Sequence, residues 1–170
     1  HMARNALVHK ENMELGLKTE NLFEETAKKE NFIVQKSSLS EDRFKHIDFF
    51  LEQDHFKYSV DVKARKKTNR DDAKVNDEWT WIEFKNVLGR KGWLYGEADY
   101  IAFERADDFL MVNRENLVKF CEDKVDLETM VSRPYQAEYK VYQRQGRRDL
   151  ITRVRMDDLA NLEGNIILQK

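Results

Sequence analysis

The sequence predicts an α/β fold in which a central mixed β-sheet is flanked by helices and followed by a C-terminal β-hairpin extension. The chain of 170 residues is long enough for one domain with a buried core, and we expect a single domain over residues 3–170. Segments with the apolar spacing of helices are interspersed with segments that alternate between polar and apolar residues, as strands do. One proline and six glycines impose few breaks on these segments.

The first half of the chain predicts one helix and several strands. Phe23 and Ala27 repeat at helical spacing and Thr19 is a suitable N-cap, so we expect a helix over residues 19–30. A polar loop is expected over residues 37–43. The strands expected around this loop cover residues 32–34, 45–51 and 57–63. The last two are predicted to form a hairpin, because a polar turn separates them.

The second half predicts a long basic loop, further strands and two helices. Asn113 is a suitable N-cap for a helix over residues 114–124, and a short C-terminal helix is expected to begin at Met156. The basic loop covers residues 64–78. The strands expected here cover residues 79–85, 94–104, 109–112, 135–143 and 150–155. The last two form the C-terminal hairpin, with Gln-Gly-Arg-Arg at its turn.

The composition excludes several classes of protein. Cys121 is the single cysteine, so a disulfide scaffold is excluded, and its helical position beside Phe120 predicts a buried thiol. The four histidines lack the spacing of a zinc site, and the chain has no phosphate-binding loop motif. Without an apolar span or a secretory signal, we expect a cytoplasmic protein that has no membrane partner. We attribute His1 and Met2 to a cloning remnant.

The net charge of −2 conceals two strongly basic segments. Residues 63–74 carry six Lys or Arg against two Asp, and residues 133–155 carry seven Lys or Arg against two acidic residues. Residues 97–128 are acidic instead, with ten acidic residues against four basic ones. Such runs are often only solvated surface. Two basic segments are nevertheless also what an electropositive face for nucleic acid requires.

A carboxylate and a lysine are expected to project together from the strand over residues 57–63. Side chains alternate between the two faces of a strand, so Asp61 and Lys63 share one face. The apolar face of the preceding strand is expected to consist of Ile47, Phe49 and Leu51. Asp48 would lie on the opposite face, where pairing of the two strands would bring it close to Asp61. Two convergent carboxylates suit a hard cation such as Mg²⁺.

Asp48, followed thirteen residues later by Asp61-Val62-Lys63, resembles the motif of the PD-(D/E)XK nuclease superfamily. The upstream sequence GLKTENLFEETAKKENFIVQKS resembles the opening of archaeal Holliday junction resolvase-like members. In those proteins a Gly-Lys pair precedes a helix that carries an acidic residue near its start. Glu20 takes the place of that acidic residue.

The resemblance implies a restriction-endonuclease-like core and a metal-dependent phosphodiesterase, which we expect to be an endonuclease acting on DNA, including structured or branched DNA. Asp48 and Asp61 would bind Mg²⁺ or Mn²⁺, with the backbone carbonyl of Val62 as a further ligand. Glu20 would complete the metal shell directly or through water. Lys63 would position the attacking water and stabilise charge on the phosphate.

A second register of the motif exists one strand later. Glu83 and Lys85 form an E-x-K string of their own, with Asp61 as the upstream acid 22 residues before Glu83. We prefer the first register, because Glu20 and Asp48 fit only that register in helix-strand-strand order. Glu83 is retained as an auxiliary site residue, with a plain surface position as the alternative.

The basic segments predict contacts with nucleic acid. Lys66 and Lys67 belong to the loop that leaves the strand carrying Lys63, and Arg147 and Arg148 lie at the hairpin turn. We expect these four side chains to bind phosphates of DNA, which gives affinity without sequence reading. A homodimer is left open. The alternatives are an RNA-directed nuclease, or a non-catalytic nucleic-acid-binding or interaction module on the same fold.

Overall fold

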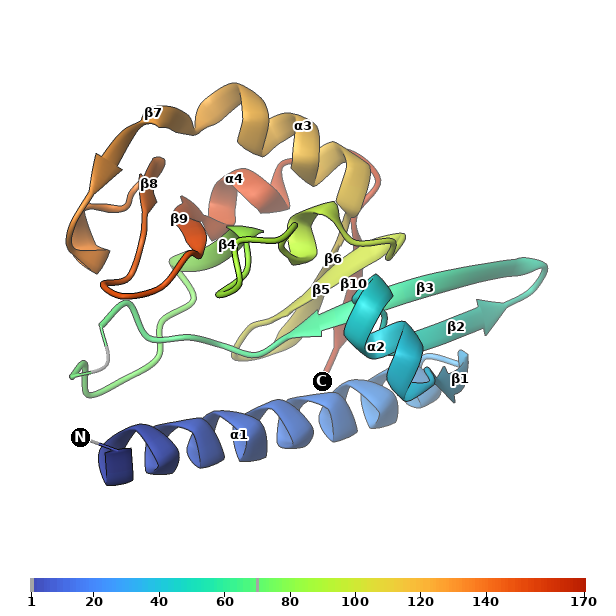
Figure 1. Ribbon diagram of the computed structural model, residues 1–170. Helices are drawn as coiled ribbons and strands as arrows, with labels where there is room; N and C mark the ends of the chain where they lie inside the picture. The colour runs from blue at the N-terminus through green and yellow to red at the C-terminus, as the bar shows by residue number, and fades with distance from the viewer. Residues whose placement is uncertain (1, 70) are drawn as a thin grey trace.

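The computed structural model describes residues 2–69 and 71–170. His1, which we attribute to a cloning remnant, and Arg70 of the basic loop lie outside the described residues. The chain forms an α/β structure with two β-sheets and helices packed around them (Figure 1). The helices are α1 (Met2–Lys29), α2 (Leu39–Lys45), α3 (Arg114–Lys124) and α4 (Met156–Ala160), with the 3-10 turns η1 (Trp93–Tyr95) and η2 (Pro134–Gln136).

The first sheet has six strands in the order β1-β2-β3-β5-β6-β10. It is mixed, because β3 and β5 run parallel while the other neighbours are antiparallel. Its strands are β1 (Ile33–Lys36), β2 (Phe49–Gln53), β3 (Phe56–Lys63), β5 (Tyr100–Glu104), β6 (Asp108–Asn113) and β10 (Ile166–Gln169). The predicted α/β class with a central mixed sheet flanked by helices is thereby confirmed.

The second sheet has four strands in the order β4-β9-β8-β7. Its strands are β4 (Trp79–Lys85), β7 (Asp126–Val131), β8 (Lys140–Tyr142) and β9 (Leu150–Arg155). Strands β8 and β9 form the predicted C-terminal hairpin, but the strand expected over residues 135–143 is corrected, because Pro134–Gln136 forms η2 and β8 begins only at Lys140. The hairpin does not extend the first sheet, because β9 pairs with β4 and β8 pairs with β7. The expected strand over residues 94–104 is also corrected: its start forms η1, and β5 begins only at Tyr100.

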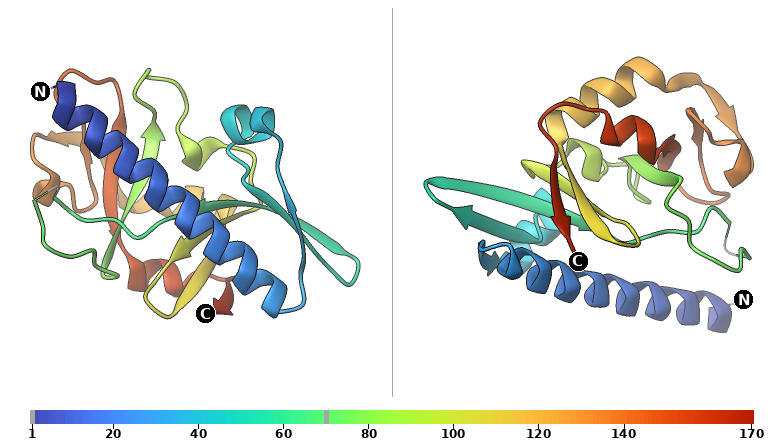
Figure 2. Two further views of the ribbon diagram at one scale, coloured as in Figure 1. Left: turned by 90° about the horizontal axis from the view of Figure 1, so that it is seen from below. Right: turned by 180° about the vertical axis from the view of Figure 1, so that it is seen from behind.

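Two apolar cores hold the layers together. One lies between α1 and the first sheet, and the other lies between the two sheets beneath α3 and α4 (Figure 2). The first core is built around Phe23, Ala27, Phe49, Leu51, Val60, Val62, Ala102, Phe109, Met111 and Leu168. The second core includes Ile47, Ile82, Phe84, Trp93, Leu94, Ile101, Phe103, Leu110, Val112, Leu117 and Val154. Strand β3 therefore has one apolar face on α1 and one face toward the second sheet.

Helix α1 is much longer than the predicted helix. It begins at Met2, and Gly16 does not interrupt it. Thr19 is therefore a buried residue within the helix and not its N-cap. Phe23 and Ala27 are fully buried, as their spacing predicted. Among the described residues, neither α1 nor any other helix is long and apolar enough to cross a membrane.

The segment between β1 and β2 differs from the predicted polar loop. It forms α2, because Ser38 accepts a hydrogen bond from the Glu41 amide while the Glu41 side chain accepts one from the Ser38 amide. The expected strand from residue 45 therefore begins only at Phe49. Ile47 lies in the core between the sheets, whereas Phe49 and Leu51 lie in the core against α1, so the predicted common face is wrong for Ile47.

Candidate functional site

The position of Asp48 is set by the turn that ends α2. His46 adopts the left-handed conformation with φ of 55°, and the Ile47 amide donates a 3.3 Å hydrogen bond to the Glu41 carbonyl. The chain then reaches the first sheet, where the Asp48 amide donates a 2.8 Å hydrogen bond to the Val60 carbonyl. Asp48 therefore lies beside β3 at the entrance to β2.

The Asp48 carboxylate is held by the backbone of β3. Its Oδ2 atom accepts a 2.7 Å hydrogen bond from the Val62 amide, and the residue is only 8% exposed. Strand β2 pairs with β3 no further than Val60, so Asp48 occupies the side of β3 where a strand would otherwise continue. Because the amide and carbonyl of one strand residue point to the same side, the Val62 carbonyl also faces the Asp48 segment.

Asp61 and Lys63 project from the same face of β3. The Lys63 Nζ atom lies 3.3 Å from Asp61 Oδ1 and 4.8 Å from the centre of the Trp93 ring. Asp61 is 3% exposed, and its second oxygen, Oδ2, is buried without a hydrogen-bond partner. A buried carboxylate oxygen without a partner is costly. This oxygen therefore marks a place that favours a cation or a donor.

Burial and mutual repulsion make the ionised forms of the two carboxylates less favourable. Burial and, after it, the nearby Asp61 charge raise the pKa of Asp48 to about 9, although the hydrogen bond from the Val62 amide opposes the rise. Burial also raises the pKa of Asp61, and the Lys63 charge opposes that rise. Without further positive charge, the pair holds a proton. The site thus has a deficit of positive charge, although Lys63 is present.

Glu20 reaches the same region from α1. Burial is the main cause that raises the pKa of Glu20, followed by the charge of Asp42. Asp61 also raises it and Lys63 lowers it, so the Glu20 carboxylate lies within electrostatic range of both residues. The structure therefore places Asp61 and Lys63 in contact and Asp48 beside the same strand, while Glu20 is related to them only through the effect of their charges on its pKa.

Glu83 approaches from the second sheet. Its Oε1 atom accepts a 3.3 Å hydrogen bond from the amide of Trp93, whose ring lies against Lys63. Burial raises the pKa of Glu83 and the Lys63 charge opposes that rise. Glu83 is thus a neighbour of the site and not a plain surface acid. Lys85, which the second register requires, is exposed at the end of β4, and Lys63 is the lysine that contacts Asp61.

The four basic residues singled out from the sequence lie in two exposed turns. Lys66 and Lys67 are exposed in the loop after β3, and the Lys67 carbonyl accepts a 3.2 Å hydrogen bond from the Trp81 indole. Arg147 and Arg148 are exposed in the turn between β8 and β9. Lys66 follows Lys63 by three residues, and its pKa is lowered by desolvation and then by the charge of Lys63.

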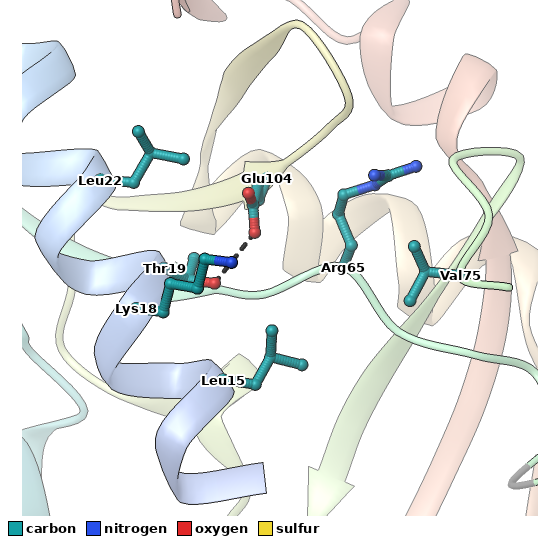
Figure 3. Close-up of a pocket in the computed structure, with 7 residues that line it drawn as sticks. All are labelled: Leu15, Lys18, Thr19, Leu22, Arg65, Val75 and Glu104. Atoms are coloured by element: carbon teal, nitrogen blue, oxygen red, sulfur yellow. Dashed lines mark hydrogen bonds between the residues drawn. The ribbon is translucent and has the colours of Figure 1, made fainter. Parts of the chain in front are cut away.

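A pocket of about 150 Å³ separates α1 from the start of the basic loop. It is lined by Leu15, Lys18, Thr19, Leu22, Arg65, Val75 and Glu104 (Figure 3). Thr19 Oγ1 donates a 2.9 Å hydrogen bond to Glu104, and Arg65 Nε lies 2.6 Å from a carboxylate oxygen of Asp77. The first contact joins α1 to β5, and the second lies within the basic loop. Arg65 is therefore engaged in the fold, while the side chains of Lys66 and Lys67 are exposed.

Sequence reasoning missed two residues of this region. One is Trp93, whose contact with Lys63 depends on η1, which no local pattern predicts. Arg144 was treated as one member of a basic run. It follows Tyr142, and the pairing of Ile151 with both Tyr142 and Glu83 brings this end of β8 to the same end of the second sheet as Glu83. The acidic residue Asp149, five positions later, was the available signal for its orientation.

The residues present fit a divalent cation that prefers oxygen ligands. Asp48 and Asp61 would hold the ion with the Val62 carbonyl, and the ion would satisfy the unpartnered Asp61 oxygen. Within residues 2–69 and 71–170, no three His, Cys, Asp or Glu side chains form a metal-binding group. Two carboxylates and one carbonyl would therefore need water and substrate oxygens as the remaining ligands, which is usual for Mg²⁺.

This arrangement has the parts that phosphodiester hydrolysis needs. Two buried carboxylates suit a cation, and a lysine beside them can donate to a phosphate or to a water molecule. The exposed basic turns near the site suit the backbone of a nucleic acid. Comparisons of the chain with protein-family models, with curated proteins and with solved structures find no match.

Proposed function

We propose that the protein is a Mg²⁺- or Mn²⁺-dependent nuclease that hydrolyses phosphodiester bonds in DNA. The observation that supports this most strongly is the buried pair Asp48 and Asp61, with Lys63 3.3 Å from Asp61 and one carboxylate oxygen left without a partner. Two buried carboxylates this close cost stability in a metal-free protein, and a bound cation would offset that cost.

In this proposal each residue of the site has its own role. Asp48, Asp61 and the Val62 carbonyl bind the cation, and Glu20 orients water at the edge of the site. A bound divalent cation polarises the phosphate and lowers the pKa of a coordinated water molecule. Lys63 donates a hydrogen bond to the attacking water and stabilises negative charge that develops on the phosphate.

The surroundings of Lys63 support this role. The Trp93 ring lies 4.8 Å from Nζ and restricts where the ammonium group can move. The Lys63 side chain is 25% exposed, so a substrate can reach it from solvent. Glu83, which bonds to the Trp93 amide, acts as a support of this arrangement and is not required to touch the substrate.

The resemblance to the PD-(D/E)XK superfamily supports the same proposal. The ordered residues Glu20, Asp48, Asp61 and Lys63 are carried by a helix, the entrance to one strand and the end of the next strand. The basic residues of the loop after β3 begin directly beyond Lys63. In this position they would contact the backbone phosphates of the DNA strand that is cut.

A cleavage assay with closed circular DNA tests the proposal, because a circle has no ends and only endonuclease action can open it. We expect nicking with Mg²⁺ or Mn²⁺ and none with EDTA. Asp61→Asn should lower the rate by at least about a hundredfold. Asp123→Asn, which changes an exposed carboxylate on α3, is the matched control and should retain the wild-type rate.

A four-way DNA junction and a matched RNA belong in the same assay. Cleavage of RNA alone would contradict the proposal in favour of an RNA-directed nuclease. Metal-dependent stabilisation of the protein without cleavage of any of these substrates would contradict it in favour of a non-catalytic binding module.

A further inference from the structure

We propose that Arg144 and Lys66 together bind a backbone phosphate of a nucleic-acid strand beside the candidate metal site. This inference rests on the proposed function and adds a contact that the second sheet supplies to the substrate. Arg144 follows β8 in the turn that leads to β9. The phosphate contact therefore comes from a part of the chain remote in sequence from β3.

A buried carboxylate fixes the orientation of Arg144. Its Nε atom lies 2.6 Å from Asp149 Oδ2, and its backbone amide donates a 3.3 Å hydrogen bond to Asp149 Oδ1. Asp149 is 0% exposed, whereas the Arg144 side chain is 39% exposed. One edge of the guanidinium is thus anchored inside the protein, and the rest of the group faces outward.

The outer end of this guanidinium is available to a ligand. In the part of the chain that the structure describes, Nη1 and Nη2 of Arg144 donate no hydrogen bond to a protein acceptor. Two N–H donors on a rigid plane match two oxygens of a phosphate. Because Asp149 has already restricted the side chain, little further conformational entropy is lost when a phosphate binds.

The strand register places Arg144 near Glu83. Ile151 of β9 lies opposite Tyr142 of β8 on one side and opposite Glu83 of β4 on the other. Arg144 is two residues beyond Tyr142, at the end of the second sheet that approaches Lys63. The register therefore brings the segment that carries Arg144 to the same end of the second sheet as Glu83, whose carboxylate bonds to the Trp93 amide.

Lys66 adds a second cation to the same place. Desolvation lowers the pKa of Lys66, and the charges of Lys63 and Arg144 lower it further, with Glu83 opposing them. The loop that carries Lys66 contacts the second sheet, because the Trp81 indole donates a 3.2 Å hydrogen bond to the Lys67 carbonyl and its ring centre lies 6.0 Å from that of Tyr142, two residues before Arg144. Cations that gather in this way are stabilised by an anion, and the anion that the proposed function brings is a phosphate.

The simplest competing explanation is that Arg144 only neutralises Asp149. The variant Arg144→Gln removes the charge but leaves Asp149 buried without its partner, so it risks unfolding. The double variant Arg144→Gln/Asp149→Asn restores a neutral hydrogen-bonded pair and keeps the fold testable. Arg133→Gln removes an exposed arginine before η2 and is the matched control.

The experiment measures affinity for a fluorescent DNA oligonucleotide in EDTA at several salt concentrations, so that no cleavage is needed. We expect the double variant to bind more weakly and to lose roughly 0.7 to 0.9 from the log-log salt slope, which corresponds to one phosphate contact. In Mg²⁺ the same variant should show a raised KM with kcat little changed. Arg133→Gln should match the wild type in each measurement.

The outcomes separate this inference from the proposed function. Wild-type slope and affinity in a folded double variant, with cleavage intact, would overturn the phosphate contact and leave the nuclease standing. Loss of binding in the double variant without cleavage by any form would support the contact and reject the nuclease. A wild-type protein that binds no DNA in EDTA would overturn the phosphate contact.

Discussion

The Val62 amide donates a 2.7 Å hydrogen bond to the carboxylate of Asp48, fourteen residues earlier in the chain. This bond connects the two segments that carry the candidate metal ligands. It also keeps the Asp48 carboxylate turned toward Asp61, although the two acids repel each other when both are ionised. The backbone of β3 therefore organises the site before any ligand arrives.

Asp61→Asn is expected to remove metal binding while leaving the metal-free protein folded, because the amide carries no buried charge. At a Mg²⁺ concentration of 100 times Kd, the wild type should gain about 2.7 kcal/mol in the free energy of unfolding. The variant should gain nothing. Chemical denaturation with and without Mg²⁺ measures this difference. An equal gain in the variant, or wild-type cleavage by it, would remove the proposed site.

Lys63→Ala is expected to affect chemistry more than metal binding, because Lys63 donates to water and phosphate and is not a ligand. The rate of cleavage should fall by about a hundredfold or more, while the stabilisation by Mg²⁺ is retained. Lys85→Ala is the matched control and also tests the second register of the motif. A Lys63→Ala protein that loses metal affinity but keeps its rate would contradict the role assigned to Lys63.

Arg147→Ala/Arg148→Ala tests the turn between β8 and β9. If both side chains contact phosphates, removing them should weaken binding to all DNA sequences alike and reduce the salt slope by about two units. Fluorescence anisotropy against salt concentration provides the measurement. An unchanged slope would mean that this turn does not touch the substrate.

Gly92→Ala is expected to destabilise the protein by about 1–3 kcal/mol. A Cβ atom at Gly92 would lie 2.4 Å from the Glu83 carbonyl oxygen, and this backbone atom cannot move without shifting β4. Trp93 follows directly, so its contact with Lys63 should loosen and cleavage should fall. Gly16→Ala has open space in α1 and should instead stabilise the helix by about 1 kcal/mol. Urea unfolding of both variants checks the opposite signs.

Cys121 is expected to resist alkylation in the folded protein. The residue is fully buried in α3, as predicted, and burial, with a smaller contribution from Glu122, raises its pKa to about 12. The reactive thiolate is therefore scarce at pH 8. Mass spectrometry after iodoacetamide treatment should show labelling only when denaturant is present. Rapid labelling of the native protein would be inconsistent with the buried position.

The alternation of residues in β3 was sufficient to predict that Asp61 and Lys63 share a face, because a strand has a fixed period of two. The nearness of Asp48 was also predicted, but for an incomplete reason. A continuous strand was expected to carry Asp48 opposite Asp61, whereas a left-handed turn at His46 and a bond from the Val62 amide place it there. Periodicity does not encode either feature.

The second sheet shows where local patterns fail. Strand β7 is almost entirely exposed, so its sequence lacks the apolar alternation that identifies strands. Its parallel pairing with β8 depends on contacts that only the folded chain makes. Helix α2 differs from β7, because its signal is present in the sequence. The polar composition of this segment predicts a loop, whereas the Ser38–Glu41 capping box indicates the start of a helix.

The position of β10 has a consequence for how the molecule is held together. After the chain leaves β9 in the second sheet, it returns to the first sheet, where Ile166 pairs with Met111 and Leu168 enters the core against α1. Removing β10 would leave β6 as an open edge and would take the Leu168 side chain out of the core against α1. The sheet that offers Arg144 and the sheet that carries Asp61 should therefore unfold in a single cooperative transition and resist separation by proteolysis.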